Sequence, residues 1–242
     1  MAIAVSDIPL PDAAGGSVGL TGVLAVPDGS GPWPGVVLVH EAYGVTDVMR
    51  RQVVRVAEAG YLALMPDLFS QGGARRCLVG TFRALRSGEG RAFVDIESAR
   101  ALLAARPDST GVTGVLGFCM GGGFALAAAS DRGFDAASAN YGMLPRDLDV
   151  LEHACPIVGS YGGRDHSLTG AAAKLSAALD RYGVPHDVKE YPDAGHSFLN
   201  DAESGPRAVR LLTKRILGAG PNPEAASDAW RRIEAFFAEH LV

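Results

Sequence analysis

The sequence of 242 residues has little cysteine and no excess of positive charge. Its three cysteines, Cys77, Cys119 and Cys155, are too few for a disulfide framework, so we expect reduced thiols in a cytoplasmic protein. The 22 basic and 27 acidic residues leave a net charge of −5, without the basic footprint of a nucleic-acid-binding protein. The first residues have neither the basic nor the long apolar stretch of a secretory signal peptide.

Motifs for cofactors and membrane spans are also missing. Neither G-x-x-x-x-G-K-S/T nor G-x-G-x-x-G occurs, and Gly44 stands where a zinc protease motif beginning at His40 would need its second histidine. Cys77 and Cys155 lack metal-ligand spacing. We therefore expect no metal and no organic cofactor. Residues 109–130 carry no charge, but the glycines among them favour a strand, a turn and a helix over a membrane span.

What the sequence has in excess is glycine, with 31 residues, against a typical share of about 7%. Apolar runs and amphipathic segments alternate along the chain, which predicts an α/β protein with a mainly parallel, twisted sheet and helices on both faces. We expect one domain over residues 1–242, with a loop or lid at 70–90 and an excursion at 200–223 before the last helix. The expected strands are 18–26, 35–40, 61–65, 112–117, 136–141, 156–161 and 186–191. The expected helices are 47–59, 91–105, 121–129, 171–182 and 224–240.

The segment Gly117-Phe-Cys-Met-Gly121 lies where a buried strand is expected to turn into a helix. It has the G-x-nucleophile-x-G pattern of a nucleophile elbow, with Cys119 in place of serine. The two glycines leave room for the strained backbone of such a turn. The Cys119 thiol would lie at a helix N-terminus, where the macrodipole favours a thiolate, and the Met120 N–H would face an oxyanion. The alternative is a buried structural cysteine.

A nucleophile elbow predicts an acid and then a histidine later in the chain. Asp165 and His196 each follow an expected strand, and sites in parallel sheets gather at the carboxyl ends of strands. Cys119 would then attack a carbonyl carbon, His196 would transfer the proton and Asp165 would orient the imidazole. Taken singly, Asp165 is also typical of a turn and His196 of a loop, so the prediction depends on all three residues together.

The pair His40-Glu41 follows another buried strand. We expect Glu41 to turn into the same cleft and the Ala42 N–H to be the second oxyanion donor, because the loop after this strand supplies that donor in elbow enzymes. A carboxylate beside the thiol would oppose thiolate formation, or would accept the thiol hydrogen bond until substrate binds. The alternative for Glu41 is a solvated loop residue.

The chain resembles the dienelactone hydrolase family, a branch of the α/β-hydrolase superfamily. The motifs that carry the resemblance are His40-Glu41, Pro66-Asp-Leu-Phe69, Gly117-Phe-Cys-Met-Gly-Gly122, Gly163-Arg-Asp-His166 and Gly195-His-Ser-Phe198. The resemblance implies the α/β-hydrolase fold and a triad of Cys119, Asp165 and His196. It also implies that Glu41 holds the resting thiol and then helps to generate the thiolate, with the same two oxyanion N–H groups and no cofactor.

The residues that would bind the substrate follow the family pattern less closely. Family members that act on dienelactone bind its carboxylate with arginines, one after the Pro-Asp-Leu segment and one shortly after His-Ser-Phe. Here Leu199-Asn200 follow His-Ser-Phe without an arginine, and the basic segment 207–215 is additional to the pattern. Each arginine of 70–90 could also be a solvated surface residue. The candidates for substrate contact are Tyr43, Arg75, Arg76, Arg83, Arg86, Ser197 and Phe198.

These observations predict a hydrolase that cleaves a small ester or lactone through a Cys-His-Asp triad with an auxiliary glutamate, acidic enol-lactones being one substrate class. Two alternatives stay open. The same residues would serve a general carboxylesterase or thioesterase. The other is a non-catalytic module with the same fold, which senses redox state through the thiol or binds a ligand and does not turn over a substrate. The predicted partner is a small molecule, not a nucleic acid or a membrane, and the sequence does not indicate an oligomeric state.

Overall fold

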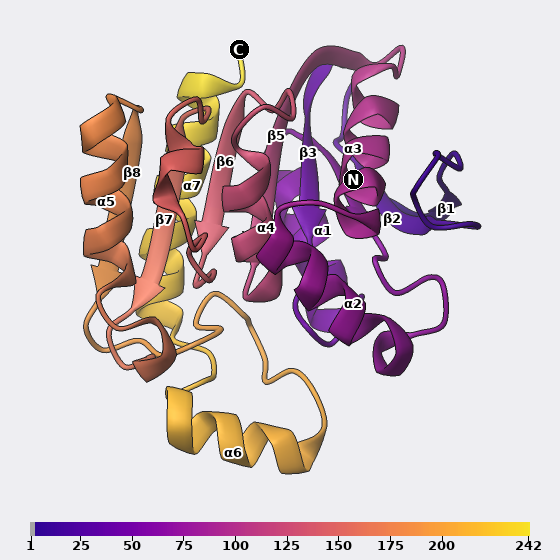
Figure 1. Cartoon of the computed structure of the whole chain (residues 1–242). Coiled ribbons are helices and arrows are strands. Elements are labelled where there is room, and N and C mark those ends of the chain that lie inside the picture. The colour runs from indigo at the N-terminus through magenta and orange to yellow at the C-terminus, as the bar shows by residue number, and fades with distance from the viewer. Residues whose placement is uncertain (1–2) are drawn as a thin grey trace.

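A computed structural model describes residues 3–242 of the chain and places them around one eight-stranded sheet (Figure 1). The strands lie in the order β1-β2-β4-β3-β5-β6-β7-β8, and only the pairs β1–β2 and β2–β4 are antiparallel. The strands are β1 (Ala4–Pro9), β2 (Thr21–Val26), β3 (Trp33–Val39), β4 (Leu62–Pro66), β5 (Ser109–Phe118), β6 (Ala136–Asn140), β7 (Ile157–Gly162) and β8 (His186–Tyr191). The predicted mainly parallel sheet is therefore confirmed.

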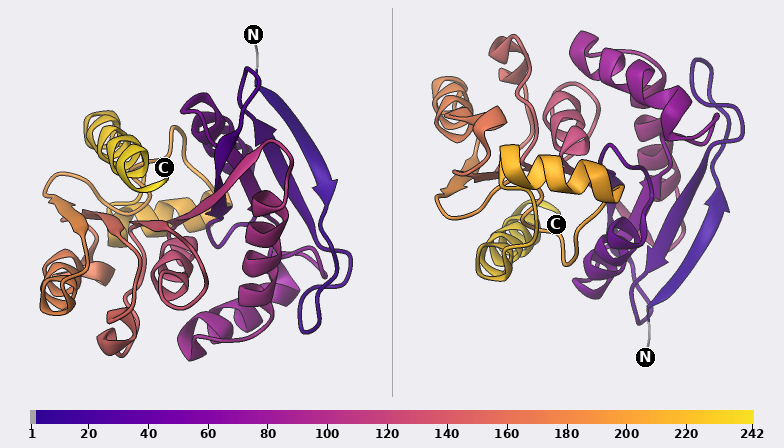
Figure 2. Two further views of the ribbon diagram at one scale, coloured as in Figure 1. Left: turned by 90° about the horizontal axis from the view of Figure 1, so that it is seen from above. Right: turned by 90° about the horizontal axis from the view of Figure 1, so that it is seen from below.

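Helices cover both faces of the sheet. Figure 2 shows α1 and α7 on one face and α3, α4 and α5 on the other, while α2 packs on α3 and α4. The helices are α1 (Asp47–Glu58), α2 (Ala74–Ser87), α3 (Arg91–Ala104), α4 (Met120–Ala128), α5 (Ala171–Tyr182), α6 (Arg207–Leu217) and α7 (Pro223–His240). Two short 3-10 helices are η1 (Leu148–Leu151) and η2 (His166–Leu168). Because both faces are covered, central strands such as β4 are fully buried apolar runs.

The expected strands and helices are all present, and their bounds lie within three residues of those predicted. The additions are β1 and α6, which the sequence did not indicate. Strand β2 begins at Thr21 rather than at residue 18, because Gly19 has a left-handed backbone with φ of 66°. The uncharged stretch 109–130 folds as β5, a tight turn and α4, and no helix within residues 3–242 is long and apolar enough to cross a membrane.

The prediction of a loop or lid at residues 70–90 is wrong, because most of this segment forms α2. Its glycines suggested a loop, but Gly88 ends the helix with φ of 76°, and only Gly80 lies in its interior. The helix forms because its apolar residues recur at helical spacing and pack toward α3 and α4. These buried residues are Cys77, Thr81, Ala84 and Leu85.

Residues 200–223 leave the sheet before α7, as predicted. Within this excursion, α6 lies beyond the carboxyl ends of the strands, at the lower end of the molecule in Figure 1, and contacts η2. Gly218 ends α6 with a left-handed φ of 59°, and the chain then returns to begin α7. The excursion therefore places one amphipathic helix over the edge at which a parallel sheet presents its functional loops.

Candidate active site

The turn between β5 and α4 has the backbone geometry expected of a nucleophile elbow. Cys119 has φ of 57° and ψ of −117°, a strained conformation for a residue with a side chain. A Cβ atom on Gly117 would lie 1.9 Å from the carbonyl oxygen of Gly121, and one on Gly121 would lie 2.0 Å from the carbonyl oxygen of Val39. Only glycine fits at these two positions. The turn therefore holds the partly exposed thiol of Cys119 in front of α4, as the sequence predicted.

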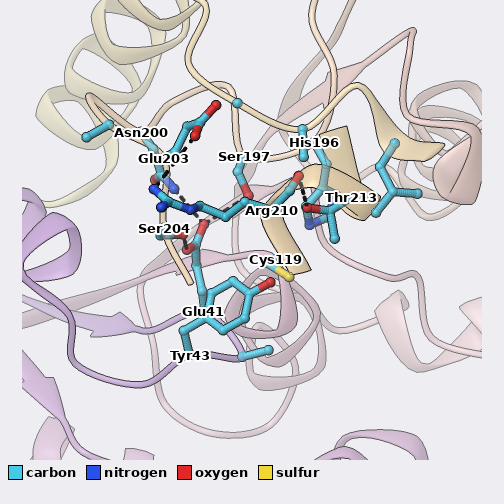
Figure 3. A pocket seen from close by; sticks show the side chains of 15 residues that line it. Glu41, Tyr43, Cys119, His196, Ser197, Asn200, Glu203, Ser204, Arg210 and Thr213 are labelled. Carbon is cyan, nitrogen blue, oxygen red and sulfur yellow. Dashed lines mark hydrogen bonds and ion pairs between the residues drawn. The ribbon is translucent and has the colours of Figure 1, made fainter. Parts of the chain in front are cut away.

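The loops after β7 and β8 bring Asp165 and His196 together. The Nδ1 atom of His196 lies 2.5 Å from Oδ2 of Asp165, which is fully buried. The other oxygen of Asp165 accepts hydrogen bonds from the Ser167 backbone N–H at 3.1 Å and from the Ser167 hydroxyl at 2.6 Å. With both oxygens occupied, the carboxylate holds the imidazole in one orientation. His196 lines the same cavity as Cys119 (Figure 3).

The electrostatics of this group favour a charged imidazolium. Burial disfavours the charged form of His196, but the charge and hydrogen bond of Cys119 and the hydrogen bond of Asp165 outweigh it and raise the pKa of His196 to about 10. Burial also opposes the ionised form of Asp165, yet the hydrogen bond from His196 lowers the pKa of Asp165. Cys119 and Asp165 therefore both favour the protonated form of His196, and His196 in turn favours the ionised form of Asp165.

Glu41 turns into the same cavity from the end of β3, where its side chain is almost fully buried. One carboxylate oxygen accepts hydrogen bonds from Ser197 at 3.1 Å and from Asn200 at 2.9 Å, and the other accepts one from Ser204 at 2.8 Å (Figure 3). Burial raises the pKa of Tyr43, and the negative charges of Cys119 and Glu41 raise it further. The thiol and the carboxylate thus line the same cavity.

The family resemblance implied that Glu41 holds the resting thiol of Cys119. In this structure it does not. Within residues 3–242, its hydrogen bonds come from Ser197, Asn200 and Ser204, and none joins it to Cys119. The physical reason is that a buried carboxylate needs several donors, and the loop after His196 supplies three of them. Sequence reasoning missed these donors because nothing local indicates that this loop folds over the end of β3.

Two backbone N–H groups are available as oxyanion donors. Met120 is the first residue of α4, so its N–H has no partner within the helix. The Ala42 N–H donates to no acceptor within the part of the chain that the structure describes, and Ala42 lines the cavity beside Cys119. Their role as donors to an oxyanion stays a prediction.

The cavity has a volume of about 120 Å³ and lies between the ends of the strands and α6. Tyr43 and Ser197 line it, as expected for residues that contact substrate. Phe198 does not line it, because its ring is fully buried and packs against the rings of Tyr141 and Tyr191, with centroids 5.6 and 5.0 Å away. Phe198 therefore supports the wall of the site rather than its surface.

Nearly the whole chain matches one known protein family. A model described as the dienelactone hydrolase family matches residues 20–241, nearly the whole chain. The chain belongs to the dienelactone hydrolase family. It is accordingly a hydrolase with the α/β-hydrolase fold, and the resemblance drawn from its motifs is confirmed.

This dienelactone hydrolase family member is similar to individual proteins over most or all of their length. The carboxymethylenebutenolidase of Pseudomonas putida is 29% identical over 209 residues, which cover 81% of this chain and 89% of that protein. A dienelactone hydrolase-like promiscuous phosphotriesterase from metagenomic libraries aligns over 100% of both chains, with a TM-score of 0.79 and 22% identity. Dienelactone hydrolase from Anabaena variabilis aligns over 100% of both chains, with a TM-score of 0.68 and 20% identity. The two structural comparisons support the fold.

The arginine that reaches the cavity of this family member is one that the sequence did not single out. Arg75, Arg76 and Arg83 are exposed on α2, as is Arg86, and the structure does not bring them to the cavity. Arg210 of α6 lines it instead, with its guanidinium 3.7 Å from the carboxylate of Glu203 (Figure 3). The available signal was the basic segment 207–215, but no motif indicates that this segment covers the strand ends.

The remaining candidates for metal binding or thiol chemistry lie away from this site. Cys77 is buried in α2. Burial raises the pKa of Cys155 to about 12, which keeps that thiol protonated. No three histidine, cysteine, aspartate or glutamate side chains come together as a metal site in the region that the structure describes, residues 3–242. The reactive groups that the fold does assemble are therefore those of the cavity.

Proposed function

We propose that this hydrolase cleaves small carboxylic esters or lactones by acyl transfer to Cys119, with His196 as acid and base and Asp165 as its orienting group. One observation carries the proposal: the elbow cysteine shares a cavity with a histidine whose Nδ1 lies 2.5 Å from a fully buried aspartate. A strained nucleophile, a base and an orienting acid in this order are typical of acyl transfer.

The reaction follows from these positions. The Cys119 thiol transfers its proton to His196, and its sulfur forms a bond to the carbonyl carbon. The carbonyl π electrons move to oxygen, which the Ala42 and Met120 N–H groups stabilise. When the tetrahedral intermediate collapses, the carbon–oxygen bond of the ester breaks and the leaving oxygen takes a proton from His196. Water then loses a proton to His196 and its oxygen attacks the thioester carbon. The carbon–sulfur bond breaks, the acid is released, and the Cys119 sulfur regains a proton from His196.

Glu41 is the auxiliary carboxylate of this mechanism. Its carboxylate lines the cavity that holds the thiol, and like charges repel in a poorly solvated cavity. The His196 imidazolium offsets that repulsion. Glu41 thereby couples the formation of the thiolate to the protonation of His196, which is the state that donates a proton to the leaving group.

The cavity also favours a class of substrate. Its volume of about 120 Å³ fits small molecules, and Arg210 is positioned to pair with a carboxylate on the substrate. Carboxylate-bearing lactones, of the kind that the name carboxymethylenebutenolidase denotes for the Pseudomonas putida relative, fit both features. A general carboxylesterase would need no such cation, so the position of Arg210 favours acidic substrates over neutral ones.

Steady-state hydrolysis of 4-nitrophenyl acetate by purified variants tests the proposal. We expect Cys119→Ala and His196→Gln to lose at least about 10³-fold in kcat, because removing one member of a triad disables the whole unit. Cys155→Ala is the matched control, since this cysteine is outside the cavity, and it should keep wild-type activity. Full activity in Cys119→Ala would contradict the proposal. Rapid labelling of Cys119 by iodoacetamide without ester turnover would favour the sensing module instead.

A further inference from the structure

His40 is a fully buried histidine that the mechanism does not use. Its Nδ1 lies 2.7 Å from the carbonyl oxygen of Glu41, and its Nε2 lies 3.1 Å from the backbone nitrogen of Leu68. A backbone N–H can only donate, so Nε2 accepts and Nδ1 carries the proton and donates to Glu41. Burial lowers the pKa of His40, in keeping with a neutral ring.

The acceptor of His40 is one end of the peptide group that ends in the Ala42 N–H. The carbonyl of Glu41 and the N–H of Ala42 belong to the same planar unit and point in opposite directions. Fixing the oxygen therefore fixes the direction of the N–H. The Gly44 N–H donates to the same oxygen at 3.0 Å, and two donors on a carbonyl polarise the peptide and strengthen its N–H as a donor.

The second hydrogen bond of His40 anchors the ring to a different loop. Leu68 lies after β4, and the neighbouring ring of Phe69 packs edge-on against the imidazole with centroids 4.8 Å apart. Nε2 also lies 3.8 Å from a carboxylate oxygen of Asp67. His40 is thus held from the β4 side while it holds the Glu41–Ala42 peptide at the end of β3.

We propose that His40 is a positioning residue that sets the direction and strength of the Ala42 N–H as an oxyanion donor. The inference rests on the proposed function, because it assigns Ala42 to the oxyanion. His40 itself does not line the cavity. It acts through the Glu41–Ala42 peptide. Residues that hydrogen-bond to a group in contact with a reacting atom commonly orient that group.

A matched pair of substitutions separates the two hydrogen bonds of His40. The amide nitrogen of Asn can replace Nδ1, so His40→Asn keeps the bond to Glu41 and loses the one to Leu68. The amide oxygen of Gln can replace Nε2, so His40→Gln keeps the bond to Leu68 and loses the one to Glu41. Each variant leaves one buried backbone group unpaired, so both should lose stability by similar amounts. Ser17→Ala, which removes a buried hydrogen bond to Asp95 away from the site, controls for lost stability alone.

We expect His40→Gln to lose about 10- to 100-fold in kcat with little change in KM, since removing an oxyanion donor outright costs about 10²- to 10³-fold. His40→Asn and Ser17→Ala should stay within about threefold of wild type, well below the loss of one donor. Equal losses in the two His40 variants would overturn the inference.

A spectroscopic measurement reads the oxyanion directly. The Cys119 sulfur adds to the carbonyl carbon of 1,1,1-trifluoroacetone, the carbonyl electrons move to oxygen, and the ¹⁹F shift of the adduct reports ionisation of the resulting hydroxyl. A tenfold weaker stabilisation of the oxyanion corresponds to an ionisation midpoint about one pH unit higher. We expect that increase in His40→Gln and not in His40→Asn. An unchanged midpoint in His40→Gln would overturn the inference.

Two further results keep the test decisive. If neither His40 variant folds, ¹⁵N NMR of the wild-type imidazole decides: a neutral ring with its proton on Nδ1 supports the inference, and a proton on Nε2 overturns it. Failure of the proposed function looks different, because Cys119→Ala would then keep its esterase activity. An inactive Cys119→Ala beside equally affected His40 variants removes only the role of His40.

Discussion

At the scale of single residues, the site depends on backbone positions that few side chains can occupy. Cys119, Tyr141 and Ser197 all have positive φ values, of 57°, 42° and 58°, and none of them is glycine. Cys119 and Ser197 line the cavity, and the Tyr141 ring packs on that of His196, with centroids 5.1 Å apart. Strained residues of this kind persist where the surrounding structure holds them, and they are concentrated at functional sites.

Gly121 should be irreplaceable for this reason. An added Cβ would lie 2.0 Å from the Val39 carbonyl oxygen, where neither backbone can move without displacing the elbow. We expect Gly121→Ala to lower the free energy of unfolding by about 3 kcal/mol or more. Gly80→Ala is the control, because no heavy atom lies within 4 Å of its added Cβ, and this exposed helix position should gain about 0.5 kcal/mol. Urea denaturation measures both, and equal effects would contradict the prediction.

At the scale of elements, α6 decides which charges reach the substrate. The helix packs weakly, and several of its apolar side chains are exposed, but Arg210, Thr213 and Leu217 line the cavity. Glu203 pairs with Arg210 and with Lys214, which holds the basic face of α6 against the loop after β8. An element outside the sheet therefore contributes the cation, while the segments after β5, β7 and β8 contribute the proposed nucleophile, acid and base.

Arg210→Gln should change specificity more than chemistry. We expect it to raise KM about tenfold for an aryl ester that carries a free carboxylate, since a charge-assisted pair is lost. KM for a neutral aryl ester of equal length should stay nearly unchanged, as should kcat for both. Arg207→Gln is the matched control, because Arg207 is an exposed residue of the same helix and does not line the cavity. An equal rise in KM for both esters would contradict a carboxylate site.

At the scale of the whole molecule, the parallel sheet explains why distant residues meet. The chain reaches the same edge after β3, β5, β7 and β8, and each visit places one part of the site there. Burial of that edge beneath α6 and its loops couples the protonation of the site to the stability of the fold.

Stability should therefore depend on the protonation of His196. Its pKa is about 10 when folded and 6.5 as an unperturbed group, so the native state binds its proton more tightly. The resulting stabilisation is fully present below pH 6.5 and is lost as the pH rises through about 10. Asp165 has the opposite sign: its lowered pKa contributes stability above pH 3.8 that is lost on further acidification.

Urea denaturation at several pH values measures this dependence. Between about pH 7 and about pH 10 the midpoint of the wild type should fall more steeply than that of His196→Gln, because the variant has no imidazolium to lose. His166→Gln, which alters an exposed histidine of η2, should keep the wild-type slope. Parallel slopes for wild type and His196→Gln would contradict the raised pKa of His196.

The sequence by itself determined the class of fold and the positions of the reactive residues. Apolar runs predicted the parallel strands, since strands covered on both faces are apolar throughout. The glycines around Cys119 predicted the elbow, because the turn leaves no space for a Cβ. The order of Asp165 and His196 followed from that elbow and from the rule that sites lie at the carboxyl ends of strands. These are local patterns with a local physical cause.

Only the tertiary structure decided what surrounds those residues. Residues 70–90 form a helix because they pack toward α3 and α4, and Arg210 reaches the cavity because the 200–223 excursion folds back over the strand ends. The donors to Glu41, and the Leu68 N–H that donates to His40, come from loops far away in the chain. Such contacts depend on how strands order themselves in the sheet, and neither composition nor periodicity encodes that order in a short window of sequence.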